Sequence, residues 1–342
     1  MPIFEGSVRV QVTRRLLRRS ALPVVLAALA LVAASCHVPG SSSSSGLPAG
    51  SQITVAEVAG LDNAPLAVAL DDGLFRQQGL TVTVKQVPSV ADAYDALQSG
   101  SADVAVGDYT SFFYGISTMG AKLTLVMDGY DATAGTMQVL TLPNSGITEP
   151  QDLENRVVAS PPAEVAQYQS DFPYSVQTLA TDAVLQSDGV DPTTVNWKEM
   201  PQSEMISALK RHKVAAIVAT DPQIIQAETQ LGAVEVLDSC SGVTANLPLS
   251  GYFSTASFAS QHGAELTAFR TALSTAQGDA GLRSAVESVL RGEHLNAQDA
   301  ALVNIGQYPT FVNVGQVQRV ANLMSTSGMI AGTVSVRGLL FQ

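Results

Sequence analysis

The sequence predicts an α/β protein built as two lobes, each a helix-covered and mainly parallel sheet, joined by a two-strand hinge. Three observations support this prediction. Strand-like and helix-like segments alternate over residues 53–127 and again over 157–237. Extended runs at 137–142 and 249–255 separate these sets, and mostly helical sequence follows the second run. Alternating elements of this size favour parallel sheets covered by helices, and two extended crossings indicate two lobes joined by a hinge.

The first unit contains the clearest helix signal. Ser89 and Asp92 have the spacing of a capping box, and Gly100 stands where a C-terminal cap is expected. Between them, apolar residues recur at helical spacing: Val90, Ala93, Tyr94 and Leu97. Helices are also expected from Pro65 to Asp72 and over 108–119, and strands over 53–58, 81–87, 102–106 and 123–127.

The second unit repeats this alternation. Strands are expected over 157–159, 195–197, 214–219 and 234–237, and helices near 148–151 and over 175–187, 205–210 and 222–229. From residue 264 onward the chain is mostly helical, including 297–305 and 317–324. Lobe 1 is therefore expected to comprise residues 51–140 and 250–342, and lobe 2 residues 141–249.

The N-terminus predicts export. Four arginines between Arg14 and Arg19 precede an apolar run over 21–34, which is shorter than the roughly 20 residues that span a bilayer. This is the pattern of a secretory signal peptide over residues 1–35. It ends in Val-Ala-Ala-Ser before Cys36, which resembles the bacterial lipobox, where the cysteine is lipidated. A Ser/Gly/Pro-rich tether follows over 36–50. An ordinary cleaved signal with an incidental cysteine is the alternative.

Charge and cysteine content exclude several classes of protein. Five of the 18 Lys and Arg and one of the 30 Asp and Glu lie in residues 1–35, so residues 36–342 carry a formal net charge of −16. So acidic a surface repels phosphate backbones, and no nucleic-acid partner is expected. With Cys36 lipidated, Cys240 is the one remaining thiol. No intramolecular disulfide and no thiolate metal cluster is expected, and Cys240 is interpreted as a partly buried free cysteine.

Polar side chains follow several of the expected strands. In open α/β sheets, ligands bind beyond the carboxyl ends of the strands, where helix N-termini leave backbone N–H groups unpaired. Ten residues are expected to form a ligand site there: Asp62, Asn63, Asp108, Tyr109, Thr110, Asp128, Tyr130, Ser160, Thr220 and Asp221. As alternatives, Asp62, Asp108 and Asp221 are helix N-caps, and Tyr109 and Tyr130 are partly core residues.

The charge of these loops bears on the ligand. Helix N-termini suit an oxyanion such as sulfonate or nitrate. The candidate loops nevertheless carry Asp62, Asp108, Asp128, Asp131 and Asp221 and no Arg or Lys. Several carboxylates around a small anion are unfavourable, so a neutral or cationic ligand with amino or hydroxyl donors fits this pattern better.

No motif of a known catalytic site is present. The sequence contains no G-x-S-x-G, P-loop or G-x-G-x-x-G motif. Its histidines are isolated, without metal-ligand spacing, at His37, His212, His262 and His294. We therefore expect a binding protein without metal or cofactor. There are two alternatives. One is an anchored sensory or adhesion module, and the other is a lipid-anchored hydrolase with a catalytic triad that cannot be recognised from residue spacing.

Five stretches, in order, resemble the bacterial solute-binding family for sulfonates, nitrate, taurine and thiamine pyrimidine precursors. They are DGLFRQQGLTV (72–82), ALQSGSADVAVG (96–107), DLENRVVAS (152–160), ALKRHKVAA (208–216) and the C-terminal Tyr308-Pro309-Thr310 with 319–324. The resemblance spans nearly the whole chain after the signal. One departure concerns the site: the family often has Trp and Pro after the later lobe-2 strand, where this chain has Ala219-Thr220-Asp221-Pro222. No specific ligand is therefore carried over.

The resemblance implies a function as well as a fold. It implies the type II periplasmic-binding-protein fold and a monomer that captures a small organic solute or oxyanion between two lobes for an ABC importer. The partners would be a permease and a cytoplasmic ATPase, with the protein held at the outer face of the cytoplasmic membrane by the lipid on Cys36. Ligand bridging the lobes would favour their closed form through a population shift.

Overall fold

The computed structural model describes residues 47–162, 175–280 and 297–342, together with residues 284, 286, 287 and 290. All the elements below belong to one compact unit, Ser45–Gln342. The predicted signal peptide, Cys36 and most of the predicted tether lie outside the described residues. Within the described residues, no helix combines the length and apolar character needed to cross a membrane.

The first sheet has five strands in the order β2-β1-β3-β10-β4. They are β1 Gln52–Glu57, β2 Thr81–Gln86, β3 Val104–Asp108, β4 Leu123–Asp131 and β10 Pro248–Thr255. β1 runs parallel to β2 and to β3, whereas β10 is antiparallel to both of its neighbours, β3 and β4. The late strand β10 is thus inserted between two strands that precede it by more than a hundred residues.

The second sheet repeats this plan in the order β7-β6-β8-β5-β9. Its strands are β5 Met137–Thr141, β6 Val157–Ser160, β7 Asn196–Glu199, β8 Ala216–Thr220 and β9 Val234–Asp238. β6 is parallel to β7 and β8, and β5 is antiparallel to β8 and β9. In each sheet four strands point one way and one strand opposes them, so the predicted mainly parallel character is confirmed.

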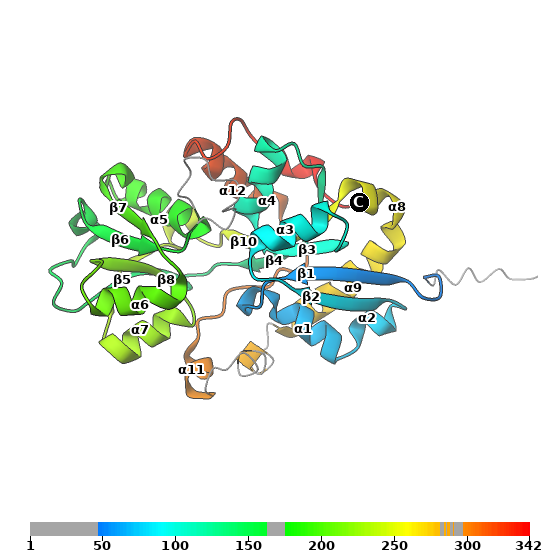
Figure 1. The fold of residues 1–342 in the computed structure, drawn as a ribbon, viewed down its shortest axis with the longest axis horizontal. Helices are drawn as coiled ribbons and strands as arrows, with labels where there is room; N and C mark the ends of the chain where they lie inside the picture. Colours follow the sequence, from blue (N-terminus) through cyan, green and yellow to red (C-terminus); the bar gives the residue numbers. More distant parts are fainter. Residues whose placement is uncertain (1–46, 163–174, 281–283, 285, 288–289, 291–296) are drawn as a thin grey trace, which may run out of the picture. The chain divides into compact units, whose positions relative to one another are not determined.

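Helices cover both faces of each sheet (Figure 1). The first sheet carries α1 Ala64–Asp71, α2 Leu74–Gln77, α3 Val90–Gln98, α4 Tyr109–Thr118, α8 Ala256–Gln261, α9 Gly263–Ala280 and α12 Val314–Thr326. The second carries α5 Val176–Ser187, α6 Gln202–Lys210 and α7 Gln223–Leu231, and α11 Ala297–Leu302 contacts α7. The chain passes from the first sheet to the second over 132–136 and returns over 239–247. The lobe boundaries themselves remain a prediction.

Local sequence accounts for where the helices begin and end. Ser89 Oγ accepts a hydrogen bond from the backbone N–H of Asp92 at 3.1 Å and caps α3, as its sequence predicts. The chain leaves this helix through Gly100, whose φ of +72° lies in the left-handed region that favours glycine. The predicted apolar stripe of α3 is buried.

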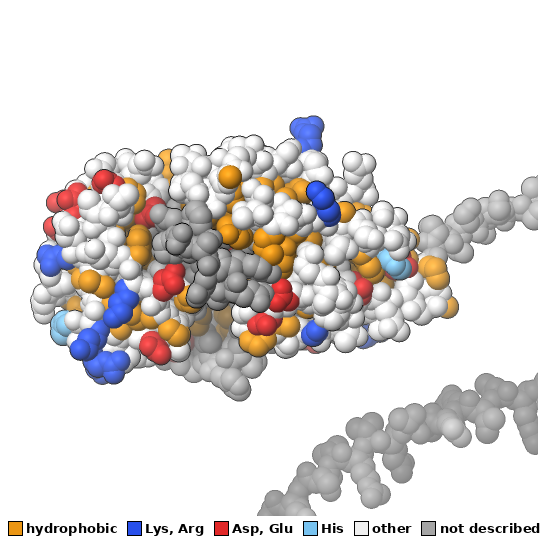
Figure 2. Space-filling view, turned by 45° about the horizontal axis from the view of Figure 1, so that its top comes forward, with side chains coloured by type: hydrophobic (Ala, Val, Ile, Leu, Met, Phe, Trp, Pro, Cys, Tyr) orange, Lys and Arg blue, Asp and Glu red, His pale blue; other side chains and the backbone are white. Residues whose placement is uncertain are grey.

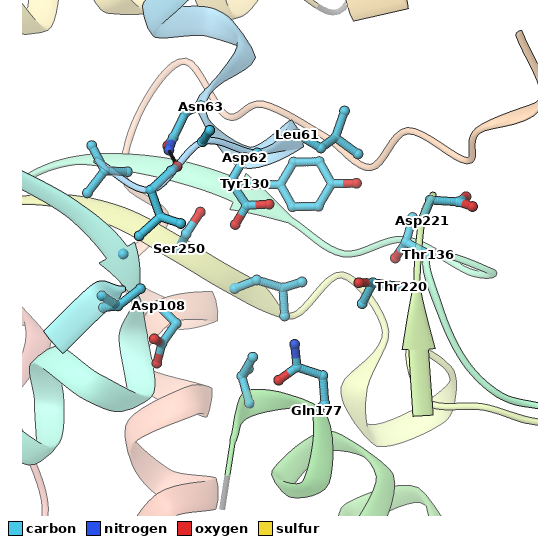
Figure 3. A pocket seen from close by; sticks show the side chains of 18 of the residues that line it. Leu61, Asp62, Asn63, Asp108, Tyr130, Thr136, Gln177, Thr220, Asp221 and Ser250 are labelled. Carbon is cyan, nitrogen blue, oxygen red and sulfur yellow. Dashed lines mark hydrogen bonds between the residues drawn. The ribbon is translucent and has the colours of Figure 1, made fainter. Parts of the chain in front are cut away.

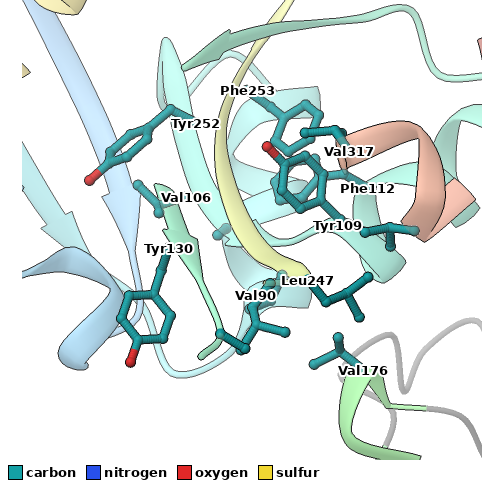
Figure 4. Close-up of a cluster of buried hydrophobic side chains, with 14 of the residues drawn as sticks. Val90, Val106, Tyr109, Phe112, Tyr130, Val176, Leu247, Tyr252, Phe253 and Val317 are labelled. Atoms are coloured by element: carbon teal, nitrogen blue, oxygen red, sulfur yellow. The ribbon is translucent and has the colours of Figure 1, made fainter. Parts of the chain in front are cut away.

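The returning strand β10 is anchored by aromatic side chains on both of its faces. Phe253 stacks on Phe112 of α4, with ring centroids 4.2 Å apart and an interplanar angle of 6°. Tyr252 points to the opposite face (Figure 4), where it packs against Phe269 of α9 with ring centroids 6.0 Å apart. A strand that is buried on both faces carries apolar residues without alternation. This burial holds β10, and the connection that precedes it, in the core of the first sheet.

One strand is longer than expected. The sequence predicts a strand over 123–127 followed by a loop, whereas β4 continues to Asp131. The extension has a partner, because Pro248 and Ser250 of β10 pair with Asp131 and Tyr130 through a register shift. Asp128 and Tyr130 therefore lie within a strand and not in a loop after it.

The face of the molecule in Figure 2 carries scattered charged side chains, with Lys and Arg gathered mainly at one end. No continuous basic stripe of the kind used by nucleic-acid-binding proteins crosses the described part of this face.

Candidate functional site

A pocket of about 370 Å³ is lined by residues from both sheets (Figure 3). Its volume lies within the range of small-molecule sites. The first sheet and its helices contribute 58–63, Val90, 106–108, Thr110, Tyr130, Leu249 and Ser250. The second contributes 175–177, Gln202 and 220–222, and Thr136, Leu290 and Asn304 complete the lining. The pocket lies beyond β1, β3 and β8, at the carboxyl ends of strands, where such sheets bind ligands.

Seven of the ten predicted site residues line this pocket. They are Asp62, Asn63, Asp108, Thr110, Tyr130, Thr220 and Asp221. The other three, Tyr109, Asp128 and Ser160, are buried and absent from the lining. The structure thus brings most of the predicted residues together, and their contact with a ligand remains a prediction.

Tyr109 and Asp128 form a buried pair beneath the pocket. The Tyr109 hydroxyl donates to Asp128 Oδ1 at 2.7 Å, and neither side chain is exposed. Burial raises the pKa of Asp128 to about 7, an effect that the hydrogen bond from Tyr109 partly offsets. Tyr109 also packs against Phe253, with ring centroids 5.7 Å apart. The Tyr109–Asp128 pair therefore joins α4, β4 and β10 within the core.

Asp62 is a lining carboxylate whose pKa is raised. It lies in a short 3₁₀ turn, Leu61–Asn63, that has no side-chain cap, so it is not an N-cap. Burial is the main cause that raises its pKa, and the negative charge of Asp108 raises it further. The nearby Ser250 hydroxyl lowers it. Ionised Asp62 is therefore a negative charge that no Lys or Arg among the lining residues balances.

Asp108 is both an N-cap and a lining residue. Its carboxylate accepts hydrogen bonds from the backbone N–H of Ser111 at 2.7 Å, from Ser111 Oγ at 2.7 Å and from the Thr110 hydroxyl. The N-terminal end of α4 is the favourable place for a negative charge. The N-cap alternative is therefore correct for Asp108, which nevertheless borders the pocket.

Asp221 binds a distant part of the chain. It precedes Pro222, which is the N-cap residue of α7, so Asp221 is not the N-cap of that helix. Its Oδ2 accepts a hydrogen bond from the backbone N–H of Asn304 at 2.6 Å. Residues that follow Asn304 contact the first sheet, where the backbone N–H of Gly306 donates to the Tyr130 hydroxyl at 2.7 Å. Segment 304–306 thus connects Asp221, after β8, with Tyr130 of β4.

Sequence reasoning missed several lining residues, among them Thr136, Ser175, Gln177, Gln202, Ser250 and Asn304. Ser250 lies inside a strand, and Asn304 was expected near the end of a helix. Neither follows a strand of a βα unit, which was the signal that found the others. Ser250 reaches the pocket because β10 pairs with β3 and β4. Asn304 is held there by its hydrogen bond to Asp221.

The lining combines three carboxylates with hydroxyl and amide groups and contains no Lys, Arg or His. Within the described residues, no group of three or more His, Cys, Asp or Glu side chains is arranged to hold a metal ion. The pocket can therefore hold a small molecule by hydrogen bonds and charge, with an acceptor-rich wall.

A family model described as NMT1/THI5 like matches residues 61–281. Among solved structures, the periplasmic aliphatic sulphonate-binding protein SsuA from Escherichia coli is similar at a TM-score of 0.69 and 19% identity, covering 85% of this chain and 98% of that one. The alkanesulfonate-binding protein SsuA from Xanthomonas axonopodis pv. citri, bound to MOPS, is similar at a TM-score of 0.65 and 16% identity. The match covers 86% of this chain and 98% of that one.

The periplasmic nitrate-binding protein NrtA from Synechocystis PCC 6803 gives a TM-score of 0.57 at 16% identity, covering 73% of this chain and 68% of that one. At these identities the likeness shows the fold, and it confirms the predicted periplasmic-binding-protein architecture. No curated protein sequence matches this chain.

Proposed function

The chain belongs to the NMT1/THI5-like family, and from this premise we propose that it is the substrate-binding component of an ABC importer. In this proposal it captures a small solute in the pocket between its two sheets and performs no chemistry on it. A permease and a cytoplasmic ATPase supplied by other chains would complete the importer. The protein would act as a monomer, held at the outer face of the cytoplasmic membrane by a lipid on Cys36.

The observation that carries this proposal is the double lining of the pocket. Asp62 and Asp108 reach it from the first sheet, whereas Gln177 and Thr220 reach it from the second. A ligand that touches both walls gains more contacts when the walls approach each other, so it favours a closed arrangement. A closed form is a signal that a membrane partner can distinguish from the empty protein.

Thermal unfolding of the full-length chain tests the binding role. The screen would compare sulfonates, nitrate, amines, pyrimidines and amino acids. A ligand present at a hundred times its dissociation constant should add about 2.7 kcal/mol to the free energy of unfolding. We expect at least one class to stabilise the protein in this way.

A pair of variants on α5 localises the effect. Gln177→Trp places a large side chain in the pocket lining, whereas Gln186→Trp makes the same change at an exposed position of the same helix. The first should abolish stabilisation by the ligand, and the second should preserve it. Equal response of both variants would exclude the pocket as the binding site and contradict the proposal.

A further inference from the structure

Three backbone donors at this pocket that could receive an oxyanion already bind groups of the protein itself. A helix N-terminus binds an anion through its unpaired N–H groups. At α4, Asp108 takes this place by accepting from the Ser111 N–H at 2.7 Å. At α5, Ser175 Oγ accepts from the Thr178 N–H at 3.3 Å. The Asn304 N–H, also at the pocket, donates to Asp221 at 2.6 Å. To use these three donors, an incoming anion would have to displace a carboxylate from two of them.

The charges around the pocket also disfavour an anion. Asp62, Asp108 and Asp221 all line it, and no cationic side chain shares the lining. The charges of Asp62 and Asp221 both contribute to raising the pKa of Tyr130, after the larger effect of burial. Figure 3 shows the Tyr130 ring between Asp62 and Asp221. A ring with a carboxylate on either side is a favourable setting for an ammonium group.

Asn63 adds an independent indication of the ligand's hydrogen-bonding character. This residue lines the pocket and is 8% exposed. Its Nδ2 donates to the Val58 carbonyl oxygen at 2.5 Å, which fixes the orientation of the amide. Its Oδ1 has no hydrogen-bond partner among the described residues. A buried acceptor without a donor is costly, and a ligand N–H group would satisfy it, whereas an anion would not.

From these contacts we infer that the pocket takes a small organic cation, a ligand bearing a protonated amine, and that Asp62 is the residue that selects its charge. This inference rests on the proposed solute-binding function and departs from the sulfonate and nitrate ligands that the similar structures are named for. Asp108 and Asp221 each accept a hydrogen bond from the backbone N–H of another residue, Ser111 and Asn304, whereas the contacts that favour ionised Asp62 are the Ser250 hydroxyl and its own backbone.

The experiment compares ligands that share one skeleton and differ in charge. Putrescine, butane-1,4-diol and succinate form one set, and tyramine, tyrosol and 4-hydroxyphenylacetate form another. Ethanesulfonate and nitrate are added as anions. Thermal unfolding of the full-length chain is followed with each probe at millimolar concentration. In at least one set the amine should raise the midpoint, and the neutral and anionic members should not.

Two substitutions on the same segment identify the selecting residue. Asp62→Asn keeps the shape of the side chain and removes its charge, and it should weaken binding of the amine at least tenfold. Asp71→Asn makes the same change at the exposed end of α1 and should leave binding unchanged. Loss of folding would show as a lowered midpoint without ligand, and calorimetric titration of the folded variant then measures affinity separately.

The alternative outcomes separate this inference from the proposed function. Stabilisation by ethanesulfonate or nitrate that Gln177→Trp abolishes would support solute binding and overturn the cation inference. An amine effect that persists in Asp62→Asn would also overturn the inference, because the charge would act elsewhere. Absence of stabilisation by every probe would overturn the inference and contradict the proposed function.

Discussion

The partly buried carboxyl of Asp182 offers a quantitative test of the fold. Asp182 lies on α5, next to Trp197 of the edge strand β7. Burial raises its pKa from 3.8 to about 7, and the nearby indole N–H of Trp197 offsets part of this shift. We predict that Asp182→Asn stabilises the protein at neutral and alkaline pH, because an amide keeps the size of the carboxyl without the cost of a buried charge.

The magnitude follows from linkage between pKa and stability. A shift of about three units corresponds to about 4 kcal/mol at 1.36 kcal/mol per unit. Because the side chain of Asp182 is only partly buried, screening by solvent reduces the expected gain to about 2–3 kcal/mol. The sign follows from the raised pKa: stability falls as pH rises from 3.8 to about 7, and the loss is complete above that value. The variant and the parent should therefore be equally stable below pH 4.

Urea unfolding between pH 4 and 9 measures this difference. Trp197 is the sole tryptophan of the chain, so its fluorescence reports on the environment of Asp182 directly. Circular dichroism gives the free energy of unfolding without relying on that fluorophore. Asp188→Asn, an exposed change at the end of the same helix, should alter stability by less than about 0.5 kcal/mol. A variant that is less stable at pH 8, or whose pH profile parallels the parent, would refute the reasoning.

Three further predictions concern the anchor, the pocket and a helix cap. Cys36→Ser should move the protein from the membrane fraction to the soluble fraction, and intact-mass measurement should show loss of the lipid; a membrane-bound variant would contradict lipidation. Without ligand, Asp62→Asn should unfold at a higher temperature than the parent at neutral pH, because the raised pKa of Asp62 means that ionisation costs stability as pH rises. The same ionisation should strengthen amine binding, so unchanged affinity between acidic and neutral pH would count against Asp62. Ser89→Ala should lower the free energy of unfolding in urea by about 1 kcal/mol, because the α3 cap is lost. Ser89→Thr should retain most of the stability that the cap provides.

Much of the fold could be predicted because its signals are local. The cap at Ser89, the apolar stripe of α3 and the turn at Gly100 all lie within a dozen residues and need no distant partner. The alternation of strands and helices is similarly local, and it identified the two sheets. Pocket-lining residues at or shortly after the end of a strand, such as Asp62, Asp108 and Thr220, could be named for the same reason: the end of a strand is visible in sequence.

The differences between the expected and the observed structure have a common physical cause. The extension of β4 to Asp131 depends on pairing with β10, more than a hundred residues away. Tyr109 and Asp128 were expected at the ligand, yet they bond to each other at 2.7 Å in the core. Only packing decides which side of a strand or helix faces a pocket, because neighbouring polar positions in a loop look alike in sequence.

The sequence by itself therefore determined the fold class and the acidic character of the strand ends, since each depends on residues close together in the chain, and for the same reason it predicts an export signal. The tertiary structure decided which of those residues share one pocket and which polar groups still need a partner there. In the folded chain, Ser250, Gln177 and Asn304 line the same pocket as Asp62 and Asp221. There the backbone N–H of Asn304 donates to the carboxylate of Asp221. These contacts join segments far apart in the chain, so their energies depend on how the two sheets fold around the pocket and not on any local pattern.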